Sequence, residues 1–221
     1  MRADTGVEDR YYVHVRPQIC DLVGRSAPPS AKVLDLGCSS GRLGEELKRR
    51  RIASVVHGIE LSESVAAEAR SRLDRVWTED LALLDWRALP TDYDVVIAAD
   101  VLEHLADPWD VLRHLRACLA PGGRIIASIP NVRYWKVVAD LLIRGEFRYV
   151  GSGVLDKTHL RFFTRSSIQR LFTESGCAVE HLGPNPIERP PLRRALMAMA
   201  GDFAHVQYLV VARPSASLAS Q

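Results

Sequence analysis

A short apolar run, a glycine-rich turn and a helix follow one another in residues 32–44, and they constrain the fold most. The stretch reads KVLDLGCSSGRLG. The apolar run at residues 33–36 is too short for a helix and predicts a buried strand, after which helical spacing resumes. Gly37 and Gly41 have no Cβ, so the turn can bend sharply and bring a ligand against the backbone at a helix N-terminus.

The spacing of this turn differs from that of turns that bind dinucleotides. A dinucleotide fingerprint needs G-x-G-x-x-G, whereas this turn reads G-x-x-x-G, with Ser39 where the middle glycine would lie. Asp35, two residues before Gly37, places a carboxylate beside the turn, which suits a cationic ligand better than a pyrophosphate. The sequence therefore disfavours a nicotinamide oxidoreductase.

Strands and helices alternate through most of the chain, which predicts a mainly parallel α/β sheet with helices on both faces. Each predicted strand in the first half is a continuous apolar run, as expected for a strand that is covered on both sides. After the strand at residues 33–36, strands are predicted at 54–59, 76–77, 93–99, 124–129, 178–182 and 205–212, and helices at 9–23, 42–51, from Ser62, from Pro108, at 134–144, from Thr164 and at 192–199.

Acidic residues end four of the predicted strands, namely Asp35, Glu60, Asp80 and Asp100. Parallel sheets bind ligands beyond the carboxyl ends of their strands, so these side chains are predicted to surround a ligand. Glu60 lies about 20 residues past the glycine turn, where an acid can accept hydrogen bonds from both hydroxyls of a ribose. NAD sites use an acid in the same place, so Glu60 alone does not choose the cofactor. The alternative is that Glu60 and Asp80 are surface acids.

Together with TEDL, YDVVIAADVLEHLADP and LRACLAPGGRIIASIPN, these residues resemble the successive motifs of class I S-adenosylmethionine-dependent methyltransferases. The resemblance covers residues 11–213 and implies a Rossmann-like, seven-stranded, mainly parallel sheet with an antiparallel last strand. It also implies one domain, residues 1–213, with a helical lead-in at 1–29 and a substrate-side insertion or lid at 131–163. Residues 214–221 are expected to be a disordered tail.

The resemblance implies S-adenosyl-L-methionine as the cofactor and S-adenosyl-L-homocysteine as its product. In that family Glu60 would bind the ribose and Asp80 the adenine amino group, and Tyr12 would close over the cofactor. The implied cofactor-binding residues are Asp35, Gly37, Cys38, Ser39, Gly41, Glu60, Leu61, Asp80, Leu81, Asp100, Val101 and Tyr12.

The stretch Asp100-Val101-Leu102-Glu103-His104 resembles a D/E-x-x-E-H segment of this superfamily. The segment occurs in ubiquinone-pathway O-methyltransferases and small-RNA 2′-O-methyltransferases, in some of which it binds a divalent metal. We expect no metal here; were one bound, Asp100, Glu103 and His104 would be its ligands. His104 is otherwise a second candidate for the catalytic base, and the alternative is that Glu103 and His104 only cap backbone and pack.

Residues 155–164, LDKTHLRFFT, resemble a D-x-T-H-L-R-F-F-T segment in methyltransferases often associated with sugar, polysaccharide and small-metabolite modification. Histidine is the natural base near neutral pH, so we predict that His159 removes a proton from the acceptor and that Asp156 orients it. The alternative is that His159 braces the helix that begins after Thr164.

Residues 133–149 combine aromatic and basic side chains and form either a lid over the substrate or a helix packed on the sheet edge. The formal net charge of +2 gives no case for a nucleic-acid or membrane partner. No run approaches the ~18 apolar residues of a membrane span, and there is no apolar signal core. The four scattered cysteines are expected to be reduced thiols. We therefore expect a cytoplasmic protein that is monomeric or homodimeric.

The sequence thus predicts a methyltransferase that acts on an oxygen of a small molecule, with sugar-containing or natural-product substrates favoured. Three alternatives stay open: an N-methyltransferase, a metal-dependent O-methyltransferase, and a cofactor-binding partner protein without catalytic activity.

Overall fold

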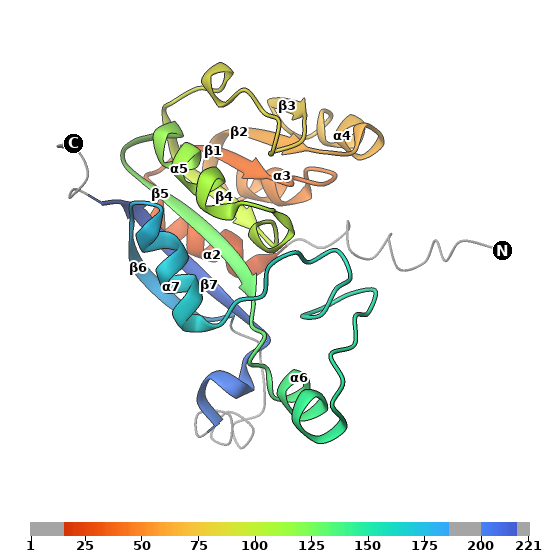
Figure 1. The fold of residues 1–221 in the computed structure, drawn as a ribbon. Coiled ribbons are helices and arrows are strands. Elements are labelled where there is room, and N and C mark those ends of the chain that lie inside the picture. Colours follow the sequence, from red (N-terminus) through yellow and green to blue (C-terminus); the bar gives the residue numbers. More distant parts are fainter. Residues whose placement is uncertain (1–15, 186–199, 216–221) are drawn as a thin grey trace. The chain divides into compact units, whose positions relative to one another are not determined.

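A computed structural model describes residues 16–185 and 200–215 of the chain. Seven strands form one sheet in the order β3-β2-β1-β4-β5-β7-β6 (Figure 1). The pairs β1–β2, β1–β4 and β2–β3 are parallel, and β6–β7 is antiparallel. The predicted seven-stranded, mainly parallel sheet is therefore confirmed. The strands are β1 (Ala31–Leu36), β2 (Ala53–Glu60), β3 (Arg75–Thr78), β4 (Tyr93–Ala99), β5 (Leu119–Pro130), β6 (Cys177–Pro184) and β7 (Gln207–Pro214).

The chain divides into two compact units, which are described in turn. Unit 1 comprises Met1–Ala98 and His114–Ile126, and unit 2 comprises Ala99–Arg113 and Ala127–Gln221. The α-helices are α2 (Pro17–Ser26), α3 (Arg42–Arg49), α4 (Glu63–Ala69), α5 (Pro108–Cys118), α6 (Trp135–Ala139) and α7 (Arg165–Glu174). None of the helices in the described part of the chain is both long and apolar enough to cross a membrane.

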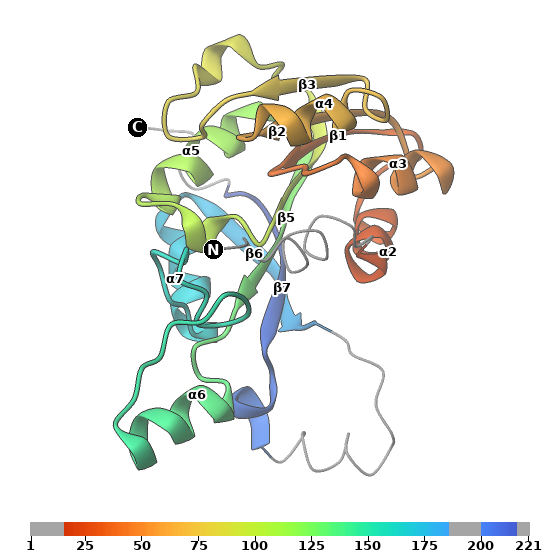
Figure 2. The ribbon, with the colours of Figure 1, turned by 90° about the vertical axis from the view of Figure 1, so that its right-hand side faces the viewer.

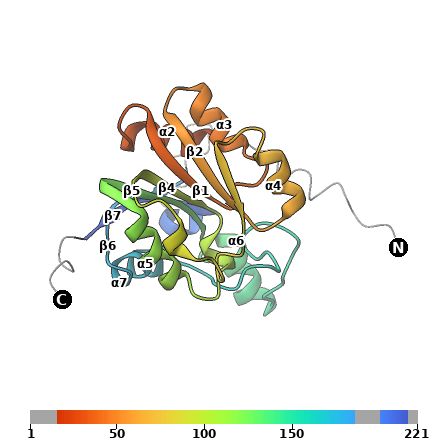
Figure 3. The same ribbon diagram turned by 90° about the horizontal axis from the view of Figure 1, so that it is seen from above.

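In unit 1, β1 lies between β2 and β4, so its side chains are covered on both faces and are completely buried at Val33, Leu34 and Leu36. The helices α2 and α3 lie side by side (Figures 2 and 3). A glycine brings α3 close to β2, because a Cβ on Gly44 would lie 2.7 Å from Val56 Cγ1. This close packing fixes where α3 begins relative to the ends of β1 and β2.

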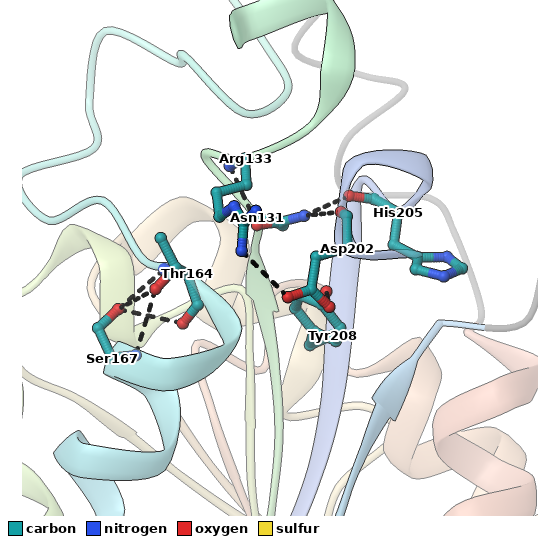
Figure 4. A network of polar contacts seen from close by, with 7 residues as sticks. All are labelled: Asn131, Arg133, Thr164, Ser167, Asp202, His205 and Tyr208. Atoms are coloured by element: carbon teal, nitrogen blue, oxygen red, sulfur yellow. Dashed lines mark hydrogen bonds and ion pairs between the residues drawn. The ribbon is translucent and has the colours of Figure 1, made fainter. Parts of the chain in front are cut away.

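In unit 2, a polar network ties the end of β5 to the start of β7 (Figure 4). The buried Asn131 amide donates to the carbonyls of Asp202 and His205, both at 2.7 Å. The Tyr208 hydroxyl donates to Asp202 Oδ1 at 2.6 Å. Asn131 also bridges to Phe163, and the Val132 N–H donates to the Phe163 carbonyl at 2.8 Å. A backbone hydrogen bond therefore joins the two ends of the predicted insertion, residues 131–163.

Several predicted boundaries are confirmed and others move. α2 begins at Pro17 because proline suits the first turn of a helix, so within the predicted helix at 9–23 a fresh helix starts there. Thr164 caps α7 in a reciprocal pair with Ser167, as Figure 4 shows. β5 begins five residues earlier than predicted. Pro214 was expected in a disordered tail, but it ends β7 and pairs with Cys177. Residues 9–15 and the predicted helix at 192–199 lie outside the described residues.

The predicted helix at residues 134–144 is α6 continued by a π-helical turn, Asp140–Arg144. No residue of α6 or of this turn is buried. The lid and the alternative of a helix packed on the sheet edge therefore both stay predictions.

Candidate functional site

The glycine turn of unit 1 is built from left-handed backbone. Gly37, Ser39 and Gly41 have φ of 59°, 50° and 80°, values that favour glycine and cost a side chain free energy. A Cβ on Gly41 would also lie 3.1 Å from Ala69 Cα. The Gly41 N–H donates to the Cys38 carbonyl at 2.9 Å, which closes the turn directly before α3.

Glu60 clamps this turn from the end of β2. Its Oε2 accepts from the Ser39 N–H at 3.0 Å and its Oε1 accepts from the Ser62 N–H at 2.9 Å. Ser62 precedes α4 as predicted, but its side chain makes no capping bond to the helix. A carboxylate has about four acceptor positions, so two backbone donors fix Glu60 and leave acceptor capacity for a ligand. Among the described residues, the buried Ser39 Oγ has no hydrogen-bond partner, which fits a ligand group at the turn.

Asp35 and Cys38 face the protein interior. Burial, together with the nearby negative charge of Glu60, raises the pKa of Asp35 to about 7, although Arg16 opposes the shift. Burial also raises the pKa of the Cys38 thiol, chiefly by desolvation. A Cβ on Gly58 of β2 would lie only 2.4 Å from Cys38 Sγ, so the Cys38 side chain lies close against the backbone of β2. The Cys38 side chain therefore packs in the protein interior, and only the Cys38 backbone lies at the surface of the turn.

Asp80, Leu61 and Leu81 lie at the ends of neighbouring strands in unit 1. Glu60 pairs with Thr78, and the Glu79 N–H donates to the Glu60 carbonyl at 3.2 Å. Asp80 is exposed, and its Oδ1 accepts from the Ala82 N–H at 2.9 Å. Leu61 is also exposed, which is unusual for leucine and leaves an apolar surface beside Glu60. The geometry suits an adenosine, whose ring is apolar and whose hydroxyls need acceptors.

In unit 2, Asp100 directly follows β4 and adopts φ of 56°. Its Oδ1 accepts from Ser128 Oγ at 2.8 Å and from Gln207 Nε2. Val101 beside it is nearly buried. Ser128 and Gln207 were missed from the sequence, because no spacing connects them with Asp100.

Glu103, His104 and His159 come together although 55 residues separate the two histidines. One side-chain ligand atom of each lies within 4.8 Å of the others. Glu103 is 1% exposed, and the two imidazole rings meet edge to face with centroids 4.8 Å apart. The Leu160 and Arg161 N–H groups donate to the Glu103 carbonyl at 2.9 and 3.0 Å, which holds the two stretches together.

The hydrogen bonds of both histidines fix their protonation pattern. His159 Nδ1 lies 3.0 Å from the Val154 carbonyl and His104 Nδ1 lies 3.3 Å from the Thr158 carbonyl. A carbonyl only accepts, so each Nδ1 carries a hydrogen, and in the neutral form of each ring the lone pair lies on Nε2. Burial and the adjacent His159 lower the pKa of His104, which keeps its ring neutral. Each Nε2 can therefore accept a proton or bind a metal.

Two residues predicted for this cluster have other hydrogen-bond partners than expected. Asp156 Oδ1 accepts from the Thr158 N–H at 2.8 Å and from Thr158 Oγ1 at 2.7 Å, and its orientation of His159 stays a prediction. Asp100 does not join Glu103 and His104; His159 does. No spacing predicts that His159 and Glu103 meet, since the two residues lie in separate motifs. Tyr12 lies outside the described residues.

Comparisons with known proteins agree with this geometry. A family model described as a methyltransferase domain matches residues 11–182. A ubiquinone biosynthesis O-methyltransferase of Aeromonas salmonicida is 30% identical over 158 residues, or 68% of this chain and 64% of the relative, so the match spans less than two thirds of that protein. A trans-aconitate 2-methyltransferase of Acidovorax sp. is 32% identical over 118 residues, or 53% of this chain and 45% of the relative.

A solved structure has the same fold. The magnesium protoporphyrin IX methyltransferase of Synechocystis, with bound S-adenosylmethionine, superposes with a TM-score of 0.58 at 18% identity. The superposition covers 97% of this chain and 86% of that one.

Proposed function

This chain belongs to the methyltransferase domain family, whose cofactor is S-adenosylmethionine, and we propose that it methylates a hydroxyl oxygen of a small molecule. The glycine turn, Glu60 and Asp80 of unit 1 would bind the cofactor. Transfer of the sulfonium methyl group to an acceptor oxygen leaves S-adenosylhomocysteine and releases the hydroxyl proton. His159 Nε2 would accept that proton as general base.

The observation that carries this proposal is the arrangement of His159. Its Nδ1 hydrogen is held by the Val154 carbonyl, so Nε2 keeps the lone pair that a base needs. The Glu103 carboxyl group and the His159 ring have ligand atoms within 4.8 Å of each other, so an acidic side chain lies beside the ring that would receive the proton. His104 would be the second base candidate. An amine acceptor would need no such base, so the arrangement favours oxygen over nitrogen.

The substrate class rests on motifs and relatives. The LDKTHLRFFT stretch favours sugar-containing or natural-product acceptors. The two named relatives are a ubiquinone biosynthesis O-methyltransferase and a trans-aconitate 2-methyltransferase, both of which bear the names of small-molecule enzymes. We propose a small-molecule acceptor on these grounds, and a monomer or homodimer as the working assembly.

A second candidate function is a metal-dependent O-methylation. Two imidazoles and a carboxylate are a ligand set for a divalent metal, and histidines that bind metals commonly donate their other N–H to a carbonyl, as His104 and His159 do. Glu103, His104 and His159 would hold the ion, and Asp100, expected in this set, is held by Ser128 and Gln207 instead. A bound metal would lower the pKa of an acceptor hydroxyl.

One assay separates these functions. Transfer of a labelled methyl group from S-adenosylmethionine is measured over a panel of sugar, phenolic, carboxylate and amine acceptors, before and after exhaustive chelation. We expect methylation of a hydroxyl acceptor at full rate after chelation. Loss of activity that Mg²⁺, Mn²⁺ or Zn²⁺ restores would establish the second candidate. Methylation of amines alone, or cofactor binding without turnover on the whole panel, would contradict both.

A further inference from the structure

We infer that Gln207, the first residue of β7, is a positioning residue that acts through Asp100 on the turn that carries His104. Gln207 Nε2 donates to Asp100 Oδ1, although 107 positions separate the two residues in the sequence. The turn is the 3₁₀ turn Leu102–His104, which begins two residues after Asp100. The catalytic consequence rests on the proposed function, in which a histidine of this cluster is the general base.

Asp100 has a backbone conformation that its surroundings must hold. Its φ of 56° lies in the left-handed region, which costs free energy for a residue with a side chain and persists only where neighbouring contacts determine it. The Asp100 N–H donates to the Ser128 carbonyl at 3.1 Å, and Ser128 Oγ donates to Asp100 Oδ1 at 2.8 Å. Gln207 supplies a second donor to the same oxygen. These three hydrogen bonds hold Asp100 in the conformation from which the turn starts.

The side-chain amide of Gln207 is itself held in one orientation by Asn185, which directly follows β6. Asn185 Nδ2 donates to Gln207 Oε1 at 2.7 Å, and the Asn185 N–H donates to the Gln207 carbonyl at 3.0 Å. A side-chain amide has a donor end and an acceptor end, whereas an ionised carboxylate only accepts. Because its oxygen is bonded to Asn185, Gln207 directs its NH₂ group toward Asp100. A directed row of hydrogen bonds therefore runs from Asn185 through Gln207 to Asp100.

The turn is held from its other end by the stretch that contains His159. The backbone N–H groups of residues 160–161 donate to the Glu103 carbonyl at 2.9 and 3.0 Å. The His104 and His159 rings meet edge to face just beyond this contact. The placement of His104 against His159 therefore depends on two anchors, the backbone of residues 160–161 at one end and the row that includes Gln207 at the other.

Gln207→Glu separates a hydrogen-bonding role from a packing role. Glutamate has nearly the shape of glutamine, so a residue that only fills space would tolerate the change. In the hydrogen-bonding role, the change replaces the donor to Asp100 by a second carboxylate, and the two like charges repel. We expect Gln207→Glu to reduce kcat on the methylated acceptor about 10- to 100-fold, because a small displacement of a catalytic group has an effect of this size. Gln207→Leu, which removes the donor without adding a charge, should have a smaller effect.

Nuclear magnetic resonance tests the placement of the rings without turnover. The nuclear Overhauser effect between the ring hydrogens of His104 and His159 is measured on the full-length protein without cofactor, with signals assigned through His104→Gln and His159→Ala. We expect a cross-peak in the unchanged protein and its loss in Gln207→Glu. The matched control is Gln169→Leu, because Gln169 is an exposed amide on α7 of the same unit. It should keep both the cross-peak and kcat.

An intact cross-peak in Gln207→Glu would overturn the inference, and so would full kcat in Gln207→Glu when His159→Ala has lost its activity. A fall in S-adenosylhomocysteine affinity with the ring contact intact would also overturn it, since Gln207 would then act on the cofactor alone. Thermal unfolding checks that each variant folds, and if Gln207→Glu does not, the same measurements on Gln207→Leu decide. Separated rings in Gln207→Glu, with full kcat in both histidine variants, would contradict the proposed base and support positioning by Gln207.

Discussion

At the scale of single residues, His159 carries the proposed chemistry. If His159 accepts the acceptor proton, His159→Ala should reduce kcat by about 10²- to 10⁴-fold, the usual contribution of general-base catalysis. The residual rate should rise with pH as hydroxide replaces the lost base. S-adenosylhomocysteine affinity should stay unchanged, because His159 is not among the proposed cofactor contacts. Steady-state kinetics and calorimetric titration measure these quantities.

The control for His159 is His181→Ala, since His181 is an exposed histidine of β6 without a proposed role. It should keep full kcat. A His159→Ala enzyme that loses thermal stability but keeps kcat within a few-fold would show that His159 only braces the loop. His104 would then be the better base, because its Nδ1 is held by a carbonyl in the same way.

Asp35 should make stability depend on pH. Its pKa is raised to about 7, mainly by burial, whereas an unfolded aspartate has a pKa of about 3.9. Between these values the folded state holds a proton that the unfolded state has lost, so the free energy of unfolding falls as pH rises through this window. Each unit of pKa difference corresponds to about 1.4 kcal/mol.

Asp35→Asn removes this titration and nearly preserves the shape of the side chain. Urea unfolding at pH 5 and at pH 8 should therefore show a smaller loss of stability in Asp35→Asn than in the unchanged protein. Parallel losses in the two proteins would mean that the buried carboxyl ionises at its ordinary pKa.

At the scale of elements, Gly44 sets the contact between α3 and β2. A Cβ there would lie 2.7 Å from Val56 Cγ1 and 2.4 Å from Leu73 Cδ2. Leucine can rotate away, but the β-branched Val56 is stiff, so we expect Gly44→Ala to destabilise the protein by about 1–3 kcal/mol through overpacking. Gly151→Ala is the control, because nothing lies within 4 Å of its added Cβ. Equal unfolding midpoints for the two variants in urea would contradict the expectation.

The elements themselves were largely predictable, because local patterns determine them. The apolar run at residues 93–99 coincides with β4, and Thr164 caps α7 through a pattern that spans only three residues. Contacts between distant stretches were not predictable. His159 meets Glu103 and His104, and Asp156 turns to Thr158, through loop geometry that no spacing encodes. The predicted cofactor residues of unit 1 lie together because strand ends of a parallel sheet share one edge.

At the scale of the whole molecule, the overall net charge does not show how charges and exposed apolar side chains are distributed along the chain. The net charge of +2 gave no reason to expect a membrane partner. Residues 133–150 carry the same formal net charge and include the exposed Leu142 and Ile143. The exposure of a side chain depends on which elements pack against its helix in the fold. No residue of α6 is buried. A sequence average cannot show this arrangement.

The cofactor is the property on which the whole molecule depends. A ligand that binds only the folded protein stabilises it by about 2.7 kcal/mol at 100 times its Kd. S-adenosylhomocysteine should therefore raise the Tm clearly, while NAD at the same concentration should not. The reason is the G-x-x-x-G turn, in which Ser39 replaces the glycine that lets a pyrophosphate approach.

Glu60→Ala tests whether the stabilisation arises at this turn. The change removes the acceptor of the Ser39 and Ser62 N–H groups and of the proposed ribose hydroxyls, so affinity for S-adenosylhomocysteine should fall by roughly 1–3 kcal/mol. Glu79→Ala, at an exposed acid next to Asp80, is the matched control and should leave affinity unchanged. A Tm increase with NAD, or full affinity in Glu60→Ala, would mean that the turn and Glu60 do not form the cofactor site. Because Glu60 also holds the turn in shape, the Tm of each variant without ligand separates lost binding from a loosened fold.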